Sequence, residues 1–111
     1  MKVDEFIKSS VFRNLDHNVQ DLLNNLNEKL GNLDYVIIKR NEPVLVFKVR
    51  TMFENKPKSK ANIATIRLKH GYITIGPYKN NDENIVECRC KEDITEKLIM
   101  DIKAIYQEKT A

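Results

Sequence analysis

The amino-acid sequence predicts a two-layer α+β domain, and two changes in apolar periodicity along the chain carry this prediction. Apolar residues recur at helical spacing over residues 16–30, alternate with polar residues from about 35 to 90, and return to helical spacing over 93–109. No helical pattern separates two alternating runs, so the strands are expected to form an antiparallel meander. We therefore expect an N-terminal helix, a five-stranded sheet and a C-terminal helix packed on one face of that sheet.

The N-terminal helix is expected over residues 16–30. Its apolar stripe consists of Val19, Leu22, Leu23, Leu26 and Leu30. Asp16 or Asn18 can cap the start, and Gly31 stands where a left-handed residue ends many helices. The segment before it is expected to add a short helical turn that presses Phe6 and Phe12 onto the core.

Five alternating runs predict the strands: YVIIKR, PVLVFKVRTMF, ANIATIRLK, YITIGP and IVECRC. His70 and Gly71 form a two-residue link suited to a tight hairpin between the third and fourth strands. The closing helix is expected over 93–109, where Asp93 and Glu96 have the spacing of a capping box. Its apolar stripe consists of Ile94, Leu98, Ile99, Ile102, Ile105 and Tyr106.

The composition is that of a single globular domain over residues 1–111, with 41% hydrophobic and 32% charged residues. No stretch approaches the length of a membrane span, so no membrane contact is expected. The first ten residues, MKVDEFIKSS, lack the apolar run of a signal peptide, which predicts a cytoplasmic protein.

The sequence contains no recognisable catalytic or cofactor-binding motif. Cys88 and Cys90 are two positions apart in an expected strand, so both are expected in the core as small hydrophobic residues. A zinc site would need four ligands, and only His17 and His70 add to the cysteines. No metal, cofactor or enzymatic activity is expected.

Charge is unevenly distributed along the chain. Residues 39–69 carry nine Lys or Arg against two Asp or Glu, a balance of +7, while 1–38 and 70–111 each carry −2. Strand alternation assigns the helix-covered face of the sheet to apolar residues and the opposite, free face to charged ones. The expected binding residues on this free face and in the NKPKSK loop are Lys48, Arg50, Lys56, Lys58, Lys60, Arg67, Lys69, Tyr72 and Arg89.

The part of the chain that contains the predicted sheet and closing helix resembles a small bacterial α+β domain family of unknown function. The matching residues run from YVIIKRNEPVLVFKVRTMF through CKEDITEKLIMDIKAIYQE, about two-thirds of the chain, with the closing pattern Glu92, Asp93, Ile94, Glu96, Leu98, Ile102 and Tyr106. Members of that family occur alone or attached to predicted transport and restriction-related proteins. The resemblance implies the same α+β fold and no catalytic residue, and the source is expected to be bacterial or phage.

Two hypotheses for function follow from the basic free face. In the first, the protein is a binding module whose cations contact nucleic acid, with Tyr72 available to stack a base. In the second, it is a phage-type inhibitor or small regulatory subunit that binds an acidic protein. A homodimer fits either hypothesis, and a face kept basic only for solubility and edge protection would have the same composition.

Overall fold

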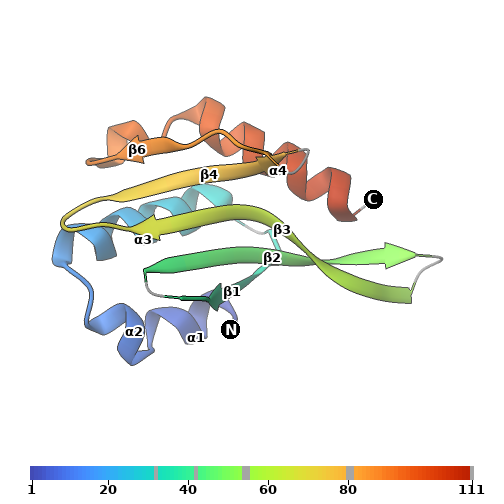
Figure 1. Cartoon of the computed structure of the whole chain (residues 1–111), viewed down its shortest axis with the longest axis horizontal. Helices are drawn as coiled ribbons and strands as arrows, with labels where there is room; N and C mark the ends of the chain where they lie inside the picture. The colour runs from blue at the N-terminus through green and yellow to red at the C-terminus, as the bar shows by residue number, and fades with distance from the viewer. Residues whose placement is uncertain (32, 42, 54–55, 80–81, 111) are drawn as a thin grey trace.

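The computed structural model describes residues 1–31, 33–41, 43–53, 56–79 and 82–110, and the side chains of 50–60, 79, 82 and 83 lie outside this description. It confirms the predicted α+β fold, with helices on one face of an antiparallel sheet (Figure 1). The helices are α1 (Val3–Ile7), α2 (Ser10–Arg13), α3 (His17–Leu30), a 3-10 turn η1 (Lys91–Asp93) and α4 (Glu96–Thr110). None of the helices in these described ranges is long and apolar enough to cross a membrane.

The sheet contains the five predicted strands and one further two-residue strand. The third strand begins at Lys56, earlier than predicted, so the lysines assigned to the NKPKSK loop belong to this strand. The strands are β1 (Val36–Lys39), β2 (Val44–Phe53), β3 (Lys56–Leu68), β4 (Ile73–Lys79), β5 (Asp82–Glu83) and β6 (Val86–Cys88). β2 and β3 form the centre, with β1 beside β2 and β4 beside β3, and every pair is antiparallel. β5 and β6 both pair with β4, at different positions along it.

The core lies between the inner face of the sheet and the helices. Tyr35 stacks on Phe47 with ring centroids 4.9 Å apart, and its hydroxyl donates a hydrogen bond to Asn27 of α3. Burial raises the pKa of Tyr35, so the hydroxyl stays protonated and remains a donor. This contact fixes α3 against the beginning of the sheet.

The first helical segments form as the sequence predicts. All five residues of the predicted α3 stripe are buried in the core. Asp16 caps α3 by accepting a hydrogen bond from the Asn18 N–H at 2.9 Å, and Gly31 ends the helix with a φ of 63°. Phe6 of α1 and Phe12 of α2 are buried with their rings edge to face.

The closing helix begins later than predicted, and the proposed capping box at Asp93 is wrong. α4 begins at Glu96, where the Thr95 hydroxyl accepts a hydrogen bond from the Leu98 N–H at 3.2 Å. The Asp93 carboxylate instead accepts hydrogen bonds from the backbone N–H groups of Arg89 and Cys90. These bonds lower the pKa of Asp93 and fold the chain into η1 before α4 begins.

A β-bulge in β3 overturns the predicted alternation around Ile63. Phe47 pairs with Ala64, but Lys48 pairs with Asn62, so Ile63 is an extra residue in β3. Strict alternation back from Ile66 in the core and Arg67 on the free face would put Ile63 on the free face, whereas the structure buries it completely in the core. Two consecutive β3 residues, Ile63 and Ala64, therefore contribute to the core, and the alternation resumes in the opposite phase beyond them.

The two cysteines do not share an environment as predicted. Cys88 ends β6 and is buried in the core, but Cys90 lies past the strand and is exposed. The chain turns into η1 at this point, so the two-residue period no longer applies. Burial, followed by the charge of Asp93, raises the pKa of the Cys88 thiol to about 11.

Because Ile63 fills the core through the bulge, Ile63→Ala should lower the free energy of unfolding by about 2–5 kcal/mol. The matched control is Ile85→Ala, since the Ile85 side chain is 57% exposed. That control should change stability by less than about 0.5 kcal/mol. Chemical denaturation measures both, and equal effects of the two substitutions would contradict the assignment of Ile63 to the core.

Native protein should react at one cysteine with a thiol reagent at neutral pH. Cys90 is exposed, whereas Cys88 is buried and its raised pKa keeps it protonated well above pH 7. Labelling followed by peptide mass analysis should find the reagent on Cys90 in native protein and on both residues in denaturant. Equal labelling of both under native conditions would be inconsistent with the structure.

Candidate nucleic-acid interface

The face of the sheet that turns away from the helices, called here the outer face, contains several of the predicted binding residues. Its residues alternate with core residues along the strands, so Lys48 follows the buried Phe47 and Arg67 follows the buried Ile66. Lys48 is paired with Val36 of β1 and with Asn62 of β3. Lys48 and Arg67 are each partly buried, and both interact with other groups in the protein.

Four of the predicted residues gather at the β3–β4 hairpin end of the sheet. Lys69 and Tyr72 flank the two-residue turn, where the Lys69 N–H donates to the Tyr72 carbonyl at 2.9 Å. The Arg89 guanidinium lies 4.0 Å from the centre of the Tyr72 ring, a cation–π contact. Together with Arg67, two positions before Lys69, these residues form the hairpin-end cluster: Arg67, Lys69, Tyr72 and Arg89.

An acidic residue within reach of this cluster reduces its charge. Glu87 of β6 is paired with Thr74, which is itself paired with Arg67. The Arg89 Nε donates a hydrogen bond to the Glu87 carboxylate at 3.0 Å. That hydrogen bond raises the pKa of Arg89, which is charged at any physiological pH in any case. The sequence pattern placed Glu87 on this face but did not reveal that it would neutralise Arg89.

The outer face is not continuously basic. Lys48 lies four residues along β2 from Val44, which is paired with Arg67, so the two cations are separated by roughly 13 Å along the strands. Between them lies a neutral row formed by Val46, Thr65 and Gly76, all buried. Three aliphatic residues of this face are only half-buried: Val36, Ile38 and Val44.

The strongest concentration of positive charge is on the β2–β3 hairpin beyond the rest of the sheet. β1 pairs with β2 only as far as Lys48, and β4 pairs with β3 only from Ala64 onward. In the described part of the chain, residues 49–53 and 56–61 therefore form a two-stranded ribbon, called here the basic arm, which projects past the sheet in Figure 1. These two ranges contain four Lys or Arg and no Asp or Glu, a net charge of +4, and Glu54 stands between them in the sequence.

The register of the arm places like charges opposite each other. Arg50 of β2 is paired directly with Lys60 of β3. Two cations at opposed positions of an antiparallel pair destabilise it, and an anion bound between them would relieve that repulsion. The side chains of Arg50, Lys56, Lys58 and Lys60 lie outside the described residues, so these four are assigned by register and sequence alone.

The structure adds no metal-binding group to this surface. In the described ranges, no three His, Cys, Asp or Glu side chains lie close enough together to hold a metal ion. His17 begins α3 and His70 lies in the β3–β4 turn, so the two histidines belong to different elements.

No protein-family model, curated protein or solved structure matches this chain.

Glu87→Gln should strengthen binding of the protein to a polyanion. The substitution removes the carboxylate that accepts a hydrogen bond from Arg89 and raises the net charge near the hairpin-end cluster by one unit. Elution from a heparin column should therefore require more salt. Glu108→Gln, an exposed position on α4, makes the same change of net charge elsewhere. If both variants shift elution equally, the cluster has no local role.

Proposed function

We propose that this protein is a nucleic-acid-binding module whose basic arm contacts the phosphate backbone. The observation that carries the proposal is the arm itself, in which a ribbon with a net charge of +4 extends beyond the sheet. The opposed Arg50 and Lys60 are unfavourable in the free protein and favourable beside phosphate. Lysines that only protect exposed strand edges would not need to stand opposite another cation.

The width of a two-stranded ribbon favours duplex DNA as the nucleic acid. The major groove of B-form DNA admits a two-stranded β-ribbon, whereas the major groove of A-form RNA is too narrow for protein side chains to enter. The arm also lacks a third strand in the described structure, and an isolated two-stranded hairpin is only marginally stable in water. A nucleic-acid surface would supply the contacts that a third strand supplies elsewhere in the sheet.

The hairpin-end cluster has a supporting role in this proposal. Lys69 and Arg67 provide further positive charge at the end of β3 opposite the arm. Base stacking on Tyr72 is available on one side only, because the Arg89 guanidinium covers the other face of its ring. We therefore assign backbone contact to the arm, and we do not expect Tyr72 to be the main determinant of affinity.

A second candidate is binding to an acidic protein through the outer face. The observation that favours it is the mixture of half-buried Val36, Ile38 and Val44 with the cations Lys48 and Arg67. Protein interfaces commonly combine an apolar centre with a charged rim, whereas nucleic-acid surfaces are more uniformly basic. Under this second candidate, the protein would act as a phage-type inhibitor or small regulatory subunit. That role stays a prediction, and so does the relationship to the small bacterial domain family.

The test of the first proposal is fluorescence anisotropy with labelled duplex DNA, duplex RNA and single-stranded DNA. We expect duplex DNA to bind most tightly, with an affinity that falls steeply between about 50 mM and 200 mM salt. Lys56→Gln/Lys58→Gln/Lys60→Gln should weaken binding and reduce the log–log salt slope by about 0.9 for each phosphate that the variant no longer neutralises.

The matched control removes the same charge from residues outside the arm, as Lys8→Gln/Lys97→Gln/Lys103→Gln. The control variant should retain most of its affinity for duplex DNA, because it lowers the net charge of the protein and leaves the arm unchanged. An equal loss in both triple variants would reduce the effect to net charge and contradict a role for the arm. If no nucleic acid binds at low salt, the second candidate is tested by a pull-down from nuclease-treated lysate. A protein that the wild type retains, and that the Arg67→Glu/Lys69→Glu variant does not retain, would support binding to an acidic protein.

A further inference from the structure

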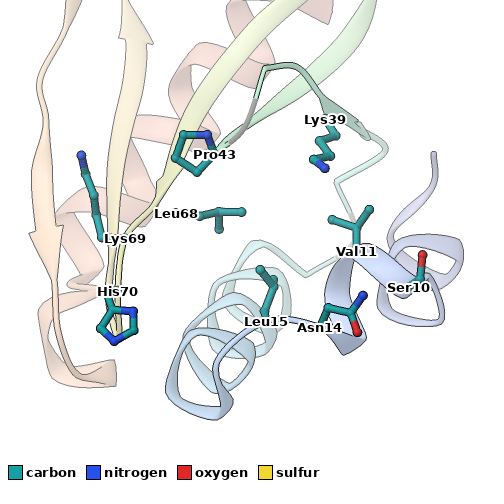
Figure 2. Close-up of a pocket in the computed structure, with 9 residues that line it drawn as sticks. All are labelled: Ser10, Val11, Asn14, Leu15, Lys39, Pro43, Leu68, Lys69 and His70. Atoms are coloured by element: carbon teal, nitrogen blue, oxygen red, sulfur yellow. The ribbon is translucent and has the colours of Figure 1, made fainter.

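A cavity of about 500 Å³ opens at the end of the sheet opposite the basic arm. It lies between the α2–α3 corner and the turns that join β1 to β2 and β3 to β4 (Figure 2). Its volume is within the range of about 300–1,000 Å³ that is typical of small-molecule sites. None of the residues of the basic arm lines it, although Lys69 of the hairpin-end cluster does, so the cavity is separate from the arm that carries the proposed function.

The floor of the cavity is aliphatic and incompletely buried. Val11 of α2, Leu15 before α3 and Leu68 at the end of β3 all pack against the core, yet each remains partly exposed. Figure 2 shows these three side chains around the same space. An apolar group bound there would complete their burial and remove apolar surface from water.

The rim of the cavity supplies hydrogen-bond donors and positive charge. Ser10, Asn14 and His70 line it, and the Lys39 side chain extends toward its interior in Figure 2. None of the residues that line the cavity is acidic. Lys39 already interacts with another group in the protein, but an ammonium has three N–H donors and can share them with a bound anion.

Two amide side chains from the first turn of α3 hold the walls of the cavity in place. The Gln20 amide donates hydrogen bonds to the carbonyls of Phe12, Arg13 and Leu15 at 2.9, 3.2 and 3.3 Å. The Asn18 amide donates to the carbonyl of Gly71 in the β3–β4 turn at 2.7 Å. The α2–α3 corner and the hairpin turn are thus tied to the same helical turn, so the cavity is formed before any ligand binds.

We propose that this cavity binds a small organic anion consisting of one anionic headgroup on an apolar body, such as a medium-chain carboxylate or alkyl phosphate. The apolar body lies on Val11, Leu15 and Leu68. The headgroup accepts hydrogen bonds from Lys39 and from the polar rim beside it. Binding requires no change in the fold, since both walls are already fixed.

The test uses 8-anilinonaphthalene-1-sulfonate, a fluorescent probe with an aromatic body and one anionic group. Its fluorescence should rise on binding to native protein and fall when octanoate or octyl phosphate competes for the cavity. Octanol, which has the same chain length without the charge, should compete at least about tenfold less well, because it lacks the charge-assisted hydrogen bond. Comparison of octanoate with octyl phosphate identifies the preferred headgroup.

Two variants locate the site. Ser10→Trp places a large side chain at an exposed residue of the cavity rim and should abolish the fluorescence increase, with circular dichroism confirming that the fold is intact. Lys39→Gln should weaken octanoate by about tenfold and leave octanol unchanged. Lys8→Gln, an exposed lysine outside the cavity, should have no effect.

Three results would overturn the proposal. They are no fluorescence increase with native protein, equal competition by octanoate and octanol, and an unchanged octanoate affinity in Lys39→Gln. The Lys39→Gln result does not depend on Ser10→Trp, so it tests the proposal even if the Ser10→Trp variant does not fold. Loss of nucleic-acid binding in the arm variants has no bearing on any of these three readouts.

Discussion

The pairing of β2 with β3 is the constraint on which the rest of the structure depends. These two strands are the longest in the sheet, β1 and β4 extend the sheet from their outer edges, and α4 packs across both. The bulge at Ile63 adds a core side chain without breaking the ladder, and the same ladder continues past the sheet to form the basic arm. The core and the candidate interface are therefore two parts of one hairpin, and the bulge at Ile63 shifts the register by one residue, so that Arg50 stands opposite Lys60 and not opposite Ala61.

Periodicity was sufficient to predict most of the fold. The five aliphatic positions of α3, the two-residue hairpin turn and the order of the strands follow from spacing alone, because a buried face imposes the period of its element. What periodicity could not predict are the places where a single residue changes the phase. The bulge at Ile63 and the exposure of Cys90 depend on how neighbouring strands and η1 pack, and the sequence near each shows an uninterrupted strand pattern. Thr95, and not Asp93, caps α4 for a similar reason. The Asp93 carboxylate already accepts a hydrogen bond from the backbone N–H of Arg89, just after β6, and the Thr95 hydroxyl accepts one from the Leu98 N–H.

The candidate site was predictable as a set of charges and not as an arrangement. Alternation placed Arg67, Lys69, Tyr72 and Arg89 on the free face, and the structure gathers them at one end of it, because a hairpin turn fixes which residues of its two strands are neighbours. The neutral row between this cluster and Lys48 depends on the register in which the strands pair. The residues of each strand taken alone do not predict that register. The cavity beside α2 was beyond reach of sequence reasoning, since it is bounded by three separate segments that meet only in the folded chain.

The Asn18 side chain has a consequence for how the chain reaches this structure. Its amide donates to the carbonyls of Gly71 and Arg89, which are 53 and 71 positions away along the chain. Closing loops of that length costs conformational entropy before any of these contacts forms, and folds rich in such distant contacts form slowly. We expect the first turn of α3 to dock late, after the β3–β4 hairpin and β6 have paired. Stopped-flow refolding of Asn18→Ala would then show faster unfolding with an almost unchanged folding rate, whereas slower folding would place this turn in the folding nucleus.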